Sequence, residues 1–227
     1  MIISNNRISS IVKENVLVKK IIKANQIVFK ETLLPAEYQQ VEYIEGTGSQ
    51  YFDTGTKLTQ NHKLEMIISH FDTSGNRKVF GSRASATASN FSVLSGPVSG
   101  IMSIVTDFFN YQNNRLAYVI DGDENMNIII SNTILKINDS EKEVTNYNEF
   151  TTPETAYLFN CNGSYPSGYK PACMRLYMFK LYENENLICN YIPCYKKSDG
   201  EVGLYDLINK VFLTNIGTGE FIKGKNI

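Results

Sequence analysis

A series of short apolar runs constrains the fold more than any other feature of this chain. Each run is four to eight residues long and is bounded by Gly, Asn, Asp or Pro, which is typical of β-strands joined by turns. No segment keeps apolar residues at the i, i+3, i+4 and i+7 positions of an amphipathic helix over successive turns. Parallel sheets need long crossover connections, usually helices, so the pattern predicts an all-β fold, an antiparallel β-sandwich. The predicted strands contain residues 50–53, 63–69, 91–94, 100–105, 115–120, 127–130, 133–137, 156–159, 174–181 and 187–192.

The run 174–181 alternates in a way that predicts its place in the sheet. Both faces are largely apolar, which favours a central strand between two layers. One predicted face carries Arg175, Tyr177, Phe179 and Leu181, and the other carries Met174, Leu176, Met178 and Lys180.

Size and composition exclude several classes of protein. With 227 residues, 42% of them hydrophobic, and with 14 Tyr and 12 Phe, the chain can bury a core and suits either one domain of roughly 200 residues or one domain plus a small appendage. A net charge of −1 gives no general electrostatic reason to bind nucleic acid or an anionic membrane. The chain has no apolar run long enough for a membrane span, and its first residues lack the order of a signal peptide. We therefore expect neither a membrane span nor export by the usual route.

The N-terminal residues 1–31 differ from the rest of the chain in charge. They hold six basic and two acidic side chains, a net charge of +4, which leaves −5 for residues 32–227. β-Branched runs at 16–23 and 27–30 predict a β-hairpin, and Pro35 marks the end of this arm.

A two-stranded hairpin is marginal alone, so the arm is expected to pack on the main domain or on a partner chain. We predict an attachment arm at 1–31 and one further domain at 32–227. An ordinary edge hairpin, whose lysines block aggregation, is the alternative. The predicted attachment residues are Val18, Ile21, Ile22, Ile27 and Phe29.

Metal-binding patterns are weak. Cys161, Cys173, Cys189 and Cys194 form no CxxC pair, and we expect reduced, mostly buried thiols. His62 and His70 have no catalytic or zinc-binding context and are predicted to be surface or half-buried strand residues.

The segment 121–132 spaces oxygen ligands as a calcium loop does. It has Met126 where an EF-hand needs Gly, and Asn132 where an EF-hand needs Glu. The segment is therefore not an EF-hand, and the sequence is compatible both with a hairpin turn and with another kind of calcium site. We predict no metal and no cofactor.

Two motifs near the ends of the main domain are distinctive. The opening segment 34–55 contains Gly46-Thr47-Gly48, and the closing segments 192–207 and 212–221 contain Gly217-Thr218-Gly219. Together with 79–82 and 172–179, they resemble LamG-like, concanavalin A-like jelly-roll domains in tail and other virion proteins of phages and prophages. The resemblance covers about residues 33–224.

The resemblance implies that the first and last strands of this domain lie side by side. The two Gly-Thr-Gly segments would then be paired turns rather than phosphate loops. The arm segment 18–29 is similar to short hairpins that precede domains in phage tail and baseplate proteins.

Some glycoside hydrolases share this jelly-roll fold, and they need two carboxylates that face each other across the glycosidic bond. The expected Glu-x-Asp-x-x-Glu strand is absent here. The nearest acidic groups, at 121–124 and 141–143, lie in turn-like polar segments and are predicted to be solvated charges. We therefore predict that the protein is not an enzyme.

Two loops, 108–114 and 160–169, could bind a sugar, because each combines aromatic rings with amide groups. The candidate residues are Tyr111, Asn113, Tyr165 and Tyr169. In the alternative, Phe108, Phe109 and Tyr111 complete the core while the other two tyrosines brace a long loop. The absence of Trp favours that alternative.

The resemblance implies a virion structural protein of a tail or baseplate, assembled in the cytoplasm of the host bacterium. Residues 1–31 would attach it to other virion proteins, with the chain in a homo-oligomer. The sandwich would contact host surface carbohydrate or fill a structural role. A capsid decoration or head-fibre protein, a glycoside hydrolase-like enzyme and a bacterial surface adhesin are the alternatives.

Overall fold

The computed structural model describes residues 6–8, 20–23, 26–30, 34–69, 75–85, 87–120 and 124–227, with side chains from residue 34 onward. The chain divides into two compact units, Met1–Ala36 and Glu37–Ile227. The predicted boundary between residues 31 and 32 falls outside the described residues. In the described part of the chain, no helix is long and apolar enough to cross a membrane.

The first unit contains a three-stranded antiparallel sheet. Its strands are β1 (Asn6–Ile8), β2 (Lys20–Lys23) and β3 (Gln26–Lys30), in that order. The pairing of β2 with β3 confirms the predicted hairpin, whereas β1 was not expected because its three residues include one apolar side chain. Ile21 and Ile22 lie in β2, Ile27 and Phe29 lie in β3, and Val18 lies outside the described residues. Their attachment role stays a prediction.

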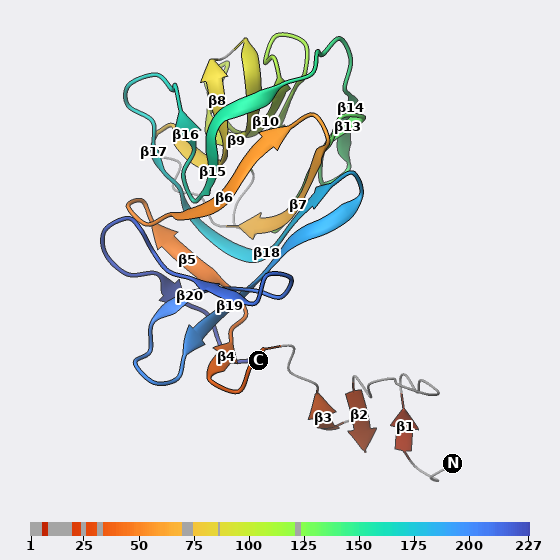
Figure 1. Cartoon of the computed structure of the whole chain (residues 1–227), viewed down its shortest axis with the longest axis vertical. Helices are drawn as coiled ribbons and strands as arrows, with labels where there is room; N and C mark the ends of the chain where they lie inside the picture. Colours follow the sequence, from red (N-terminus) through yellow and green to blue (C-terminus); the bar gives the residue numbers. More distant parts are fainter. Residues whose placement is uncertain are drawn as a thin grey trace. The chain divides into compact units, whose positions relative to one another are not determined.

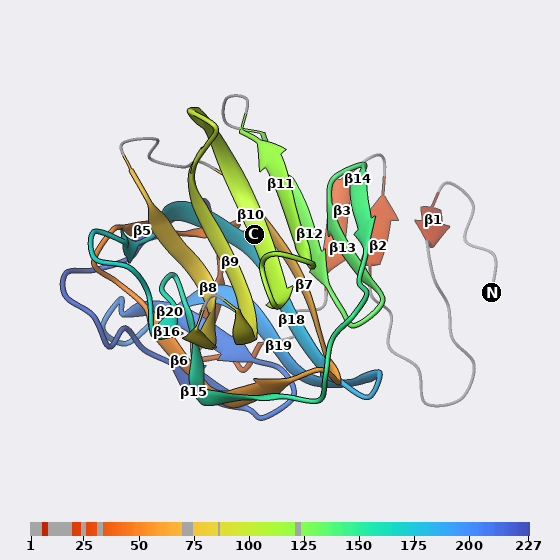
Figure 2. The same ribbon diagram turned by 90° about the horizontal axis from the view of Figure 1, so that it is seen from above.

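The second unit contains two sheets, of which the first has eight strands. They are β6 (Phe52–Thr59), β8 (Arg77–Ser85), β9 (Ala88–Val98), β10 (Ile101–Phe109), β11 (Arg115–Val119), β15 (Thr151–Leu158), β16 (Asn162–Gly163) and β17 (Lys170–Pro171). The order is β11-β10-β9-β8-β15-β6, with β16 and β17 each paired to β8. Figure 2 shows β8, β9, β10 and β11 side by side.

The second sheet has eleven strands. They are β4 (Tyr38–Gln40), β5 (Ile44–Thr47), β7 (His62–Ser69), β12 (Met126–Ile130), β13 (Ile134–Ile137), β14 (Ser140–Glu143), β18 (Cys173–Glu183), β19 (Asn186–Lys196), β20 (Val202–Asp206), β21 (Val211–Leu213) and β22 (Ile222–Lys223). Its main order is β14-β13-β12-β7-β18-β19-β20-β21. Apart from the short parallel pairings of β16 and β17, the strand pairs of this unit are antiparallel, and the predicted sandwich is confirmed (Figure 1).

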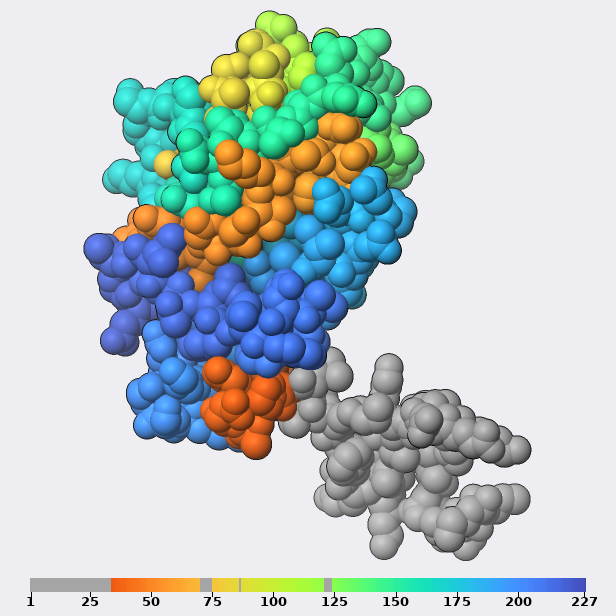
Figure 3. Space-filling model, viewed as in Figure 1, coloured from red at the N-terminus to blue at the C-terminus, as the bar shows by residue number. Residues whose placement is uncertain are grey.

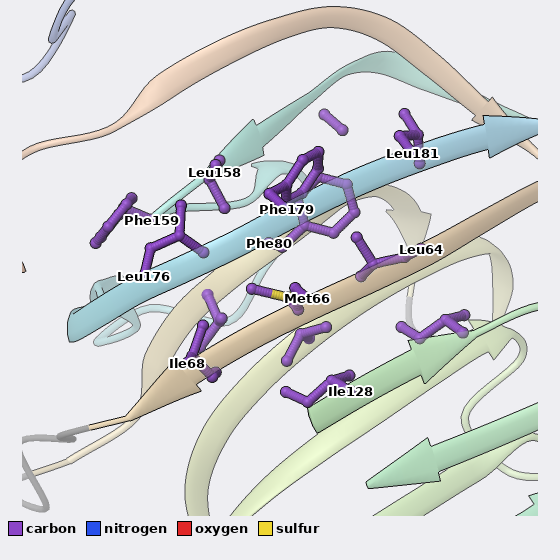
Figure 4. Close-up of a cluster of buried hydrophobic side chains, with 14 of the residues drawn as sticks. Leu64, Met66, Ile68, Phe80, Ile128, Leu158, Phe159, Leu176, Phe179 and Leu181 are labelled. Atoms are coloured by element: carbon purple, nitrogen blue, oxygen red, sulfur yellow. The ribbon is translucent and has the colours of Figure 1, made fainter. Parts of the chain in front are cut away.

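Apolar side chains from the two sheets meet in one core. Phe80 and Leu158 come from the first sheet, and Met66 and Phe179 come from the second (Figure 4). The ring of Phe179 stacks on Tyr191, with centroids 5.0 Å apart, and meets Phe80 edge-on at 5.2 Å. All five side chains are at most 2% exposed, so their burial holds the two layers together.

Strand β18 lies centrally in its sheet, between β7 and β19, as predicted. The predicted faces were wrong, because the register shifts between Leu176 and Met178 where β18 pairs with β7. A bulge of this kind reverses the alternation of all residues beyond it. The side chains that point into the core are Met174, Leu176, Phe179 and Leu181, and the opposite face is half-buried rather than covered by a second layer.

The opening and closing segments of this unit lie side by side, as the resemblance implied. Strand β22 pairs with β5, and Thr218 N donates to Ser49 O at 3.1 Å. A side chain at Gly217 would place its Cβ 2.0 Å from Ser49 O, so this close approach requires glycine. The prediction of paired turns holds only in part, because Gly46 and Thr47 belong to strand β5 and pair with β18, while the closing Gly-Thr-Gly segment lies against Ser49, just beyond the opening one. Figure 3 shows the blue closing region against the orange opening region.

Several short or polar strands were not predicted, because their sequences lack an apolar run. Strand β14 contains Glu141 and Glu143, which were expected in a turn. Its position at the edge of the sheet leaves both carboxylates in solvent, so a strand is compatible with these charges.

His62 was predicted to be a surface or half-buried strand residue; it begins strand β7, as predicted, but it is fully buried, with 3% exposure. Its Nδ1 accepts a hydrogen bond from Thr59 N at 3.0 Å, and burial lowers its pKa. His70 and residues 121–123 of the calcium-like segment lie outside the described residues. The four cysteines are free, and three of them are buried, as predicted.

Candidate functional site

The outer face of the first sheet, which points away from the core, carries a row of polar residues. Side chains alternate along a strand, so Asp107 of β10 points away from the core that its neighbour Phe108 enters. Asp107 lies opposite Arg115 of β11 and Ser92 of β9. In a second row, Asn90 lies opposite Arg83 of β8. Strand register therefore gathers these five polar side chains on one face.

An ion pair anchors this outer face. Arg115 donates from Nε and Nη2 to the two carboxylate oxygens of Asp107, at 2.6 and 2.7 Å. The Asp107 side chain is 0% exposed, and that of Arg115 is 35% exposed. Burial alone would lower the pKa of Arg115, but the hydrogen bond and charge of Asp107 outweigh it, and the pKa is raised. The guanidinium is thus held as a fixed cation at the surface.

Two tyrosines lie at this cation. The Arg115 guanidinium is 4.8 Å from the centre of the Tyr111 ring. Tyr169 is also close enough to raise the pKa of Arg115 through its charge interaction with the guanidinium. Arg115 and Tyr169 line a small cavity of about 60 Å³ together with Asn76 and the apolar side chains of Leu94 and Val105. Aromatic rings beside amide and guanidinium donors can stack on a sugar and hydrogen-bond its hydroxyls.

A loop that we name the strap, residues 160–171, crosses the same face and carries Tyr165. Its ring lies over the Arg83 guanidinium at 4.0 Å and is 6.4 Å from the Tyr169 ring. A Cβ at Gly163 would lie 2.1 Å from Arg83 O, so the start of the strap needs glycine there. The strap lies beside β8 and β15 in Figure 1.

Three of the four candidate ligand residues are thus brought to one face. Tyr111, Tyr165 and Tyr169 come from two loops that are far apart in sequence but meet around Arg115 and Arg83. Asn113 lies on the exposed turn after Tyr111. Their role in binding stays a prediction.

The alternative interpretation of these loops holds for Phe108 and Phe109, which join the core or pack against it. It does not hold for Tyr111, which contacts Arg115 instead.

Sequence reasoning missed the polar side chains beneath these rings. The relevant signal was the alternation of polar and apolar residues in Asn90-Phe91-Ser92-Val93, which places two short polar groups on one face of a strand. Asp107 and Arg115 gave no such signal, because their pairing depends on the register between β10 and β11.

Other cavities lie away from this face, and two of them are large. One of about 410 Å³ is lined by Asp199, Glu201 and Glu220, and one of about 450 Å³ is lined by Asp53 and Asp206. In the described ranges, no group of three or more His, Cys, Asp or Glu side chains could hold a metal ion. Neither cavity contains a predicted site residue.

Comparison with known proteins found a similar fold but no related sequence. No protein-family model and no curated protein sequence match the chain. The crystal structure of a proposed carbohydrate-binding protein from Bacteroides ovatus ATCC 8483 is similar, with a TM-score of 0.52 and 11% identity. The match covers 83% of this chain and 62% of the other, so it spans less than two thirds of that protein. The fold is a jelly-roll-like β-sandwich.

Proposed function

We propose that this protein binds carbohydrate on the outer face of its first sheet, without catalysing a reaction. The observation that carries the proposal is the meeting of Tyr111 and Tyr169 at Arg115, which Asp107 holds in place. This arrangement supplies flat apolar rings for a sugar ring and fixed donors for its hydroxyls. The similar fold of a proposed carbohydrate-binding protein supports the choice of ligand class.

The Tyr169→Ala variant tests this site directly. We expect at least about tenfold weaker binding to the glycan that the wild-type protein recognises, because about 1.4 kcal/mol of stacking and contact energy corresponds to that factor. A glycan array that includes bacterial cell-wall polysaccharides identifies the ligand, and calorimetry measures the affinity of each variant.

Tyr182→Ala is the matched control, because Tyr182 lies on the second sheet and also contacts a cation, Lys63, at 4.4 Å. It should leave affinity unchanged. A blank array with wild-type protein, or equal affinity of the Tyr169→Ala variant, would remove the proposed carbohydrate site.

We further propose that the sandwich is displayed on a phage virion, in a tail or baseplate, and is assembled in the host bacterial cytoplasm. The motifs at the ends of the second unit and their resemblance to virion jelly-roll domains support this. The first unit contains residues 1–31, which carry a net charge of +4. We propose that these residues attach the protein to other virion proteins or to further copies of the chain.

Deletion of residues 1–31 should abolish incorporation into particles while leaving a folded sandwich. Mass spectrometry of purified particles measures incorporation, and circular dichroism of the shortened protein checks its fold. Unchanged incorporation would contradict the attachment role, and detection only in the envelope of the host would contradict the virion location. A capsid decoration or head-fibre protein is the second candidate, which immunogold labelling of particles separates from a tail protein.

A further inference from the structure

The outer face holds polar groups beneath the strap that the sandwich itself leaves incompletely bonded. Asn90 and Ser92 are both 0% exposed, and Ser92 Oγ donates to Asn90 Oδ1 at 2.8 Å. Asn90 Nδ2 is buried without a hydrogen-bond partner among the described residues. A buried amide that keeps an unused donor is costly, and a ligand hydroxyl would satisfy it.

Tyr165 covers this polar patch. Its hydroxyl is buried beside Cys161 and Ser92 but makes no hydrogen bond of acceptable geometry to a described residue. Its ring occupies the space over Arg83, whose Nε already donates to Ser164 O and whose other guanidinium nitrogens could otherwise donate to a ligand. The Tyr165 ring therefore lies over hydrogen-bond donors that it does not satisfy. The hydroxyl groups of a sugar ring in its place could accept from those donors.

The strap is held mainly at its two ends. Ser164 N donates to Arg83 O at 3.2 Å and Ser164 O accepts from Arg83 Nε at 2.5 Å, and at the other end Lys170 N donates to Asn76 O at 3.1 Å. Between these ends, Pro166, Ser167 and Gly168 are exposed, and Gly168 has φ +91 with open space around it. The middle of the strap can consequently move without breaking the pairings of β16 and β17 with β8.

We propose that the patch formed by Arg83, Asn90 and Ser92 is a second subsite for a hydroxyl-rich sugar ring, and that Tyr165 covers it until the ligand takes its place. This inference rests on the proposed carbohydrate-binding function and extends the site from Tyr169 along the same face. Opening requires movement of residues 165–168 only, so Tyr169 keeps its place beside Arg115.

Thiol labelling measures the opening without any ligand. Cys161 lies under Tyr165 and is 3% exposed, while Cys194 lies in β19 and is 0% exposed. Burial raises the pKa of both thiols to about 12, so the two start with equally unreactive sulfur atoms. We expect iodoacetamide to label Cys161 at least about tenfold faster than Cys194, because local opening is easier than unfolding of the core. Equal rates would overturn the proposal.

The Tyr165→Ala variant then tests the subsite itself. If the cover is open about 10% of the time, its removal should raise affinity for the array glycan by about tenfold. Adding Asn90→Ala should cancel this gain. Slow labelling of Cys194 in each variant shows that the sandwich remains folded.

The outcomes separate the two proposals. Unchanged or weaker binding by the Tyr165→Ala variant, with binding still dependent on Tyr169, would overturn the covered subsite and leave the proposed function standing. Absence of glycan binding by the wild-type protein would overturn the proposed function and the subsite with it.

Discussion

Replacing Phe179 with alanine is expected to lower the free energy of unfolding by about 3–5 kcal/mol. The side chain is 0% exposed and lies between Tyr191 of its own sheet and Phe80 of the opposite sheet. Its loss would remove apolar contacts and leave a cavity where the two layers meet, because neighbouring aromatic rings relax only in part. Urea unfolding followed by circular dichroism measures the change.

Lys180→Ala is the control for this prediction. Lys180 is the next residue of β18 and is half-buried on the opposite face, so its loss should change stability by about 0.5 kcal/mol. Similar effects of the two substitutions would contradict the assignment of faces that follows from the bulge in β18.

Replacing Asp107 with alanine is expected to cost about 3 kcal/mol of stability and to abolish glycan binding. The carboxylate is 0% exposed and accepts two hydrogen bonds from Arg115, so its removal leaves a partly buried cation without its counter-ion. The Arg115 side chain is 35% exposed, which places the cost at the lower end of the range for buried pairs. Without this anchor, Arg115 would no longer hold its position at Tyr111.

Glu45→Ala provides a matched comparison. Glu45 accepts a hydrogen bond from Arg175 Nε at 2.7 Å on the second sheet, with side-chain exposures of 17% and 30%. This more exposed pair should contribute about 1 kcal/mol and nothing to glycan binding. Urea unfolding and calorimetry with the array glycan measure both effects. Retained glycan binding by the Asp107→Ala variant would show that the ion pair does not position the site.

Much of the architecture was predictable because strand formation depends on local patterns. The runs at 63–69 and 115–120 became β7 and β11 with small shifts at their ends, and the run at 187–192 lies within the longer β19, which continues to Lys196. The opening and closing segments of the second unit also met as expected, since glycine permits the close contact of Gly217 with Ser49. By contrast, the bulge in β18 reversed the predicted faces, because nothing in its alternation marks the position of an extra residue.

The candidate site was predictable only in part. The aromatic rings of the two loops could be singled out, because each loop concentrates Tyr with Asn. The side chains under them could not, because no short-range pattern connects Arg83 with Asn90 and Ser92, or Asp107 with Arg115. Their proximity follows from cross-strand register.

By itself, the sequence determined an antiparallel β-sandwich preceded by a basic arm that contains a hairpin. That is the information carried by side-chain period, turn residues and charge, all of which act over a few residues. Only the tertiary structure decided which polar groups share the outer face and that Tyr165 lies over Arg83 and beside Ser92. The positions of these side chains depend on how distant strands align and on where a loop crosses the sheet. Both are fixed by the packing of the whole core rather than by interactions between residues that are close in sequence.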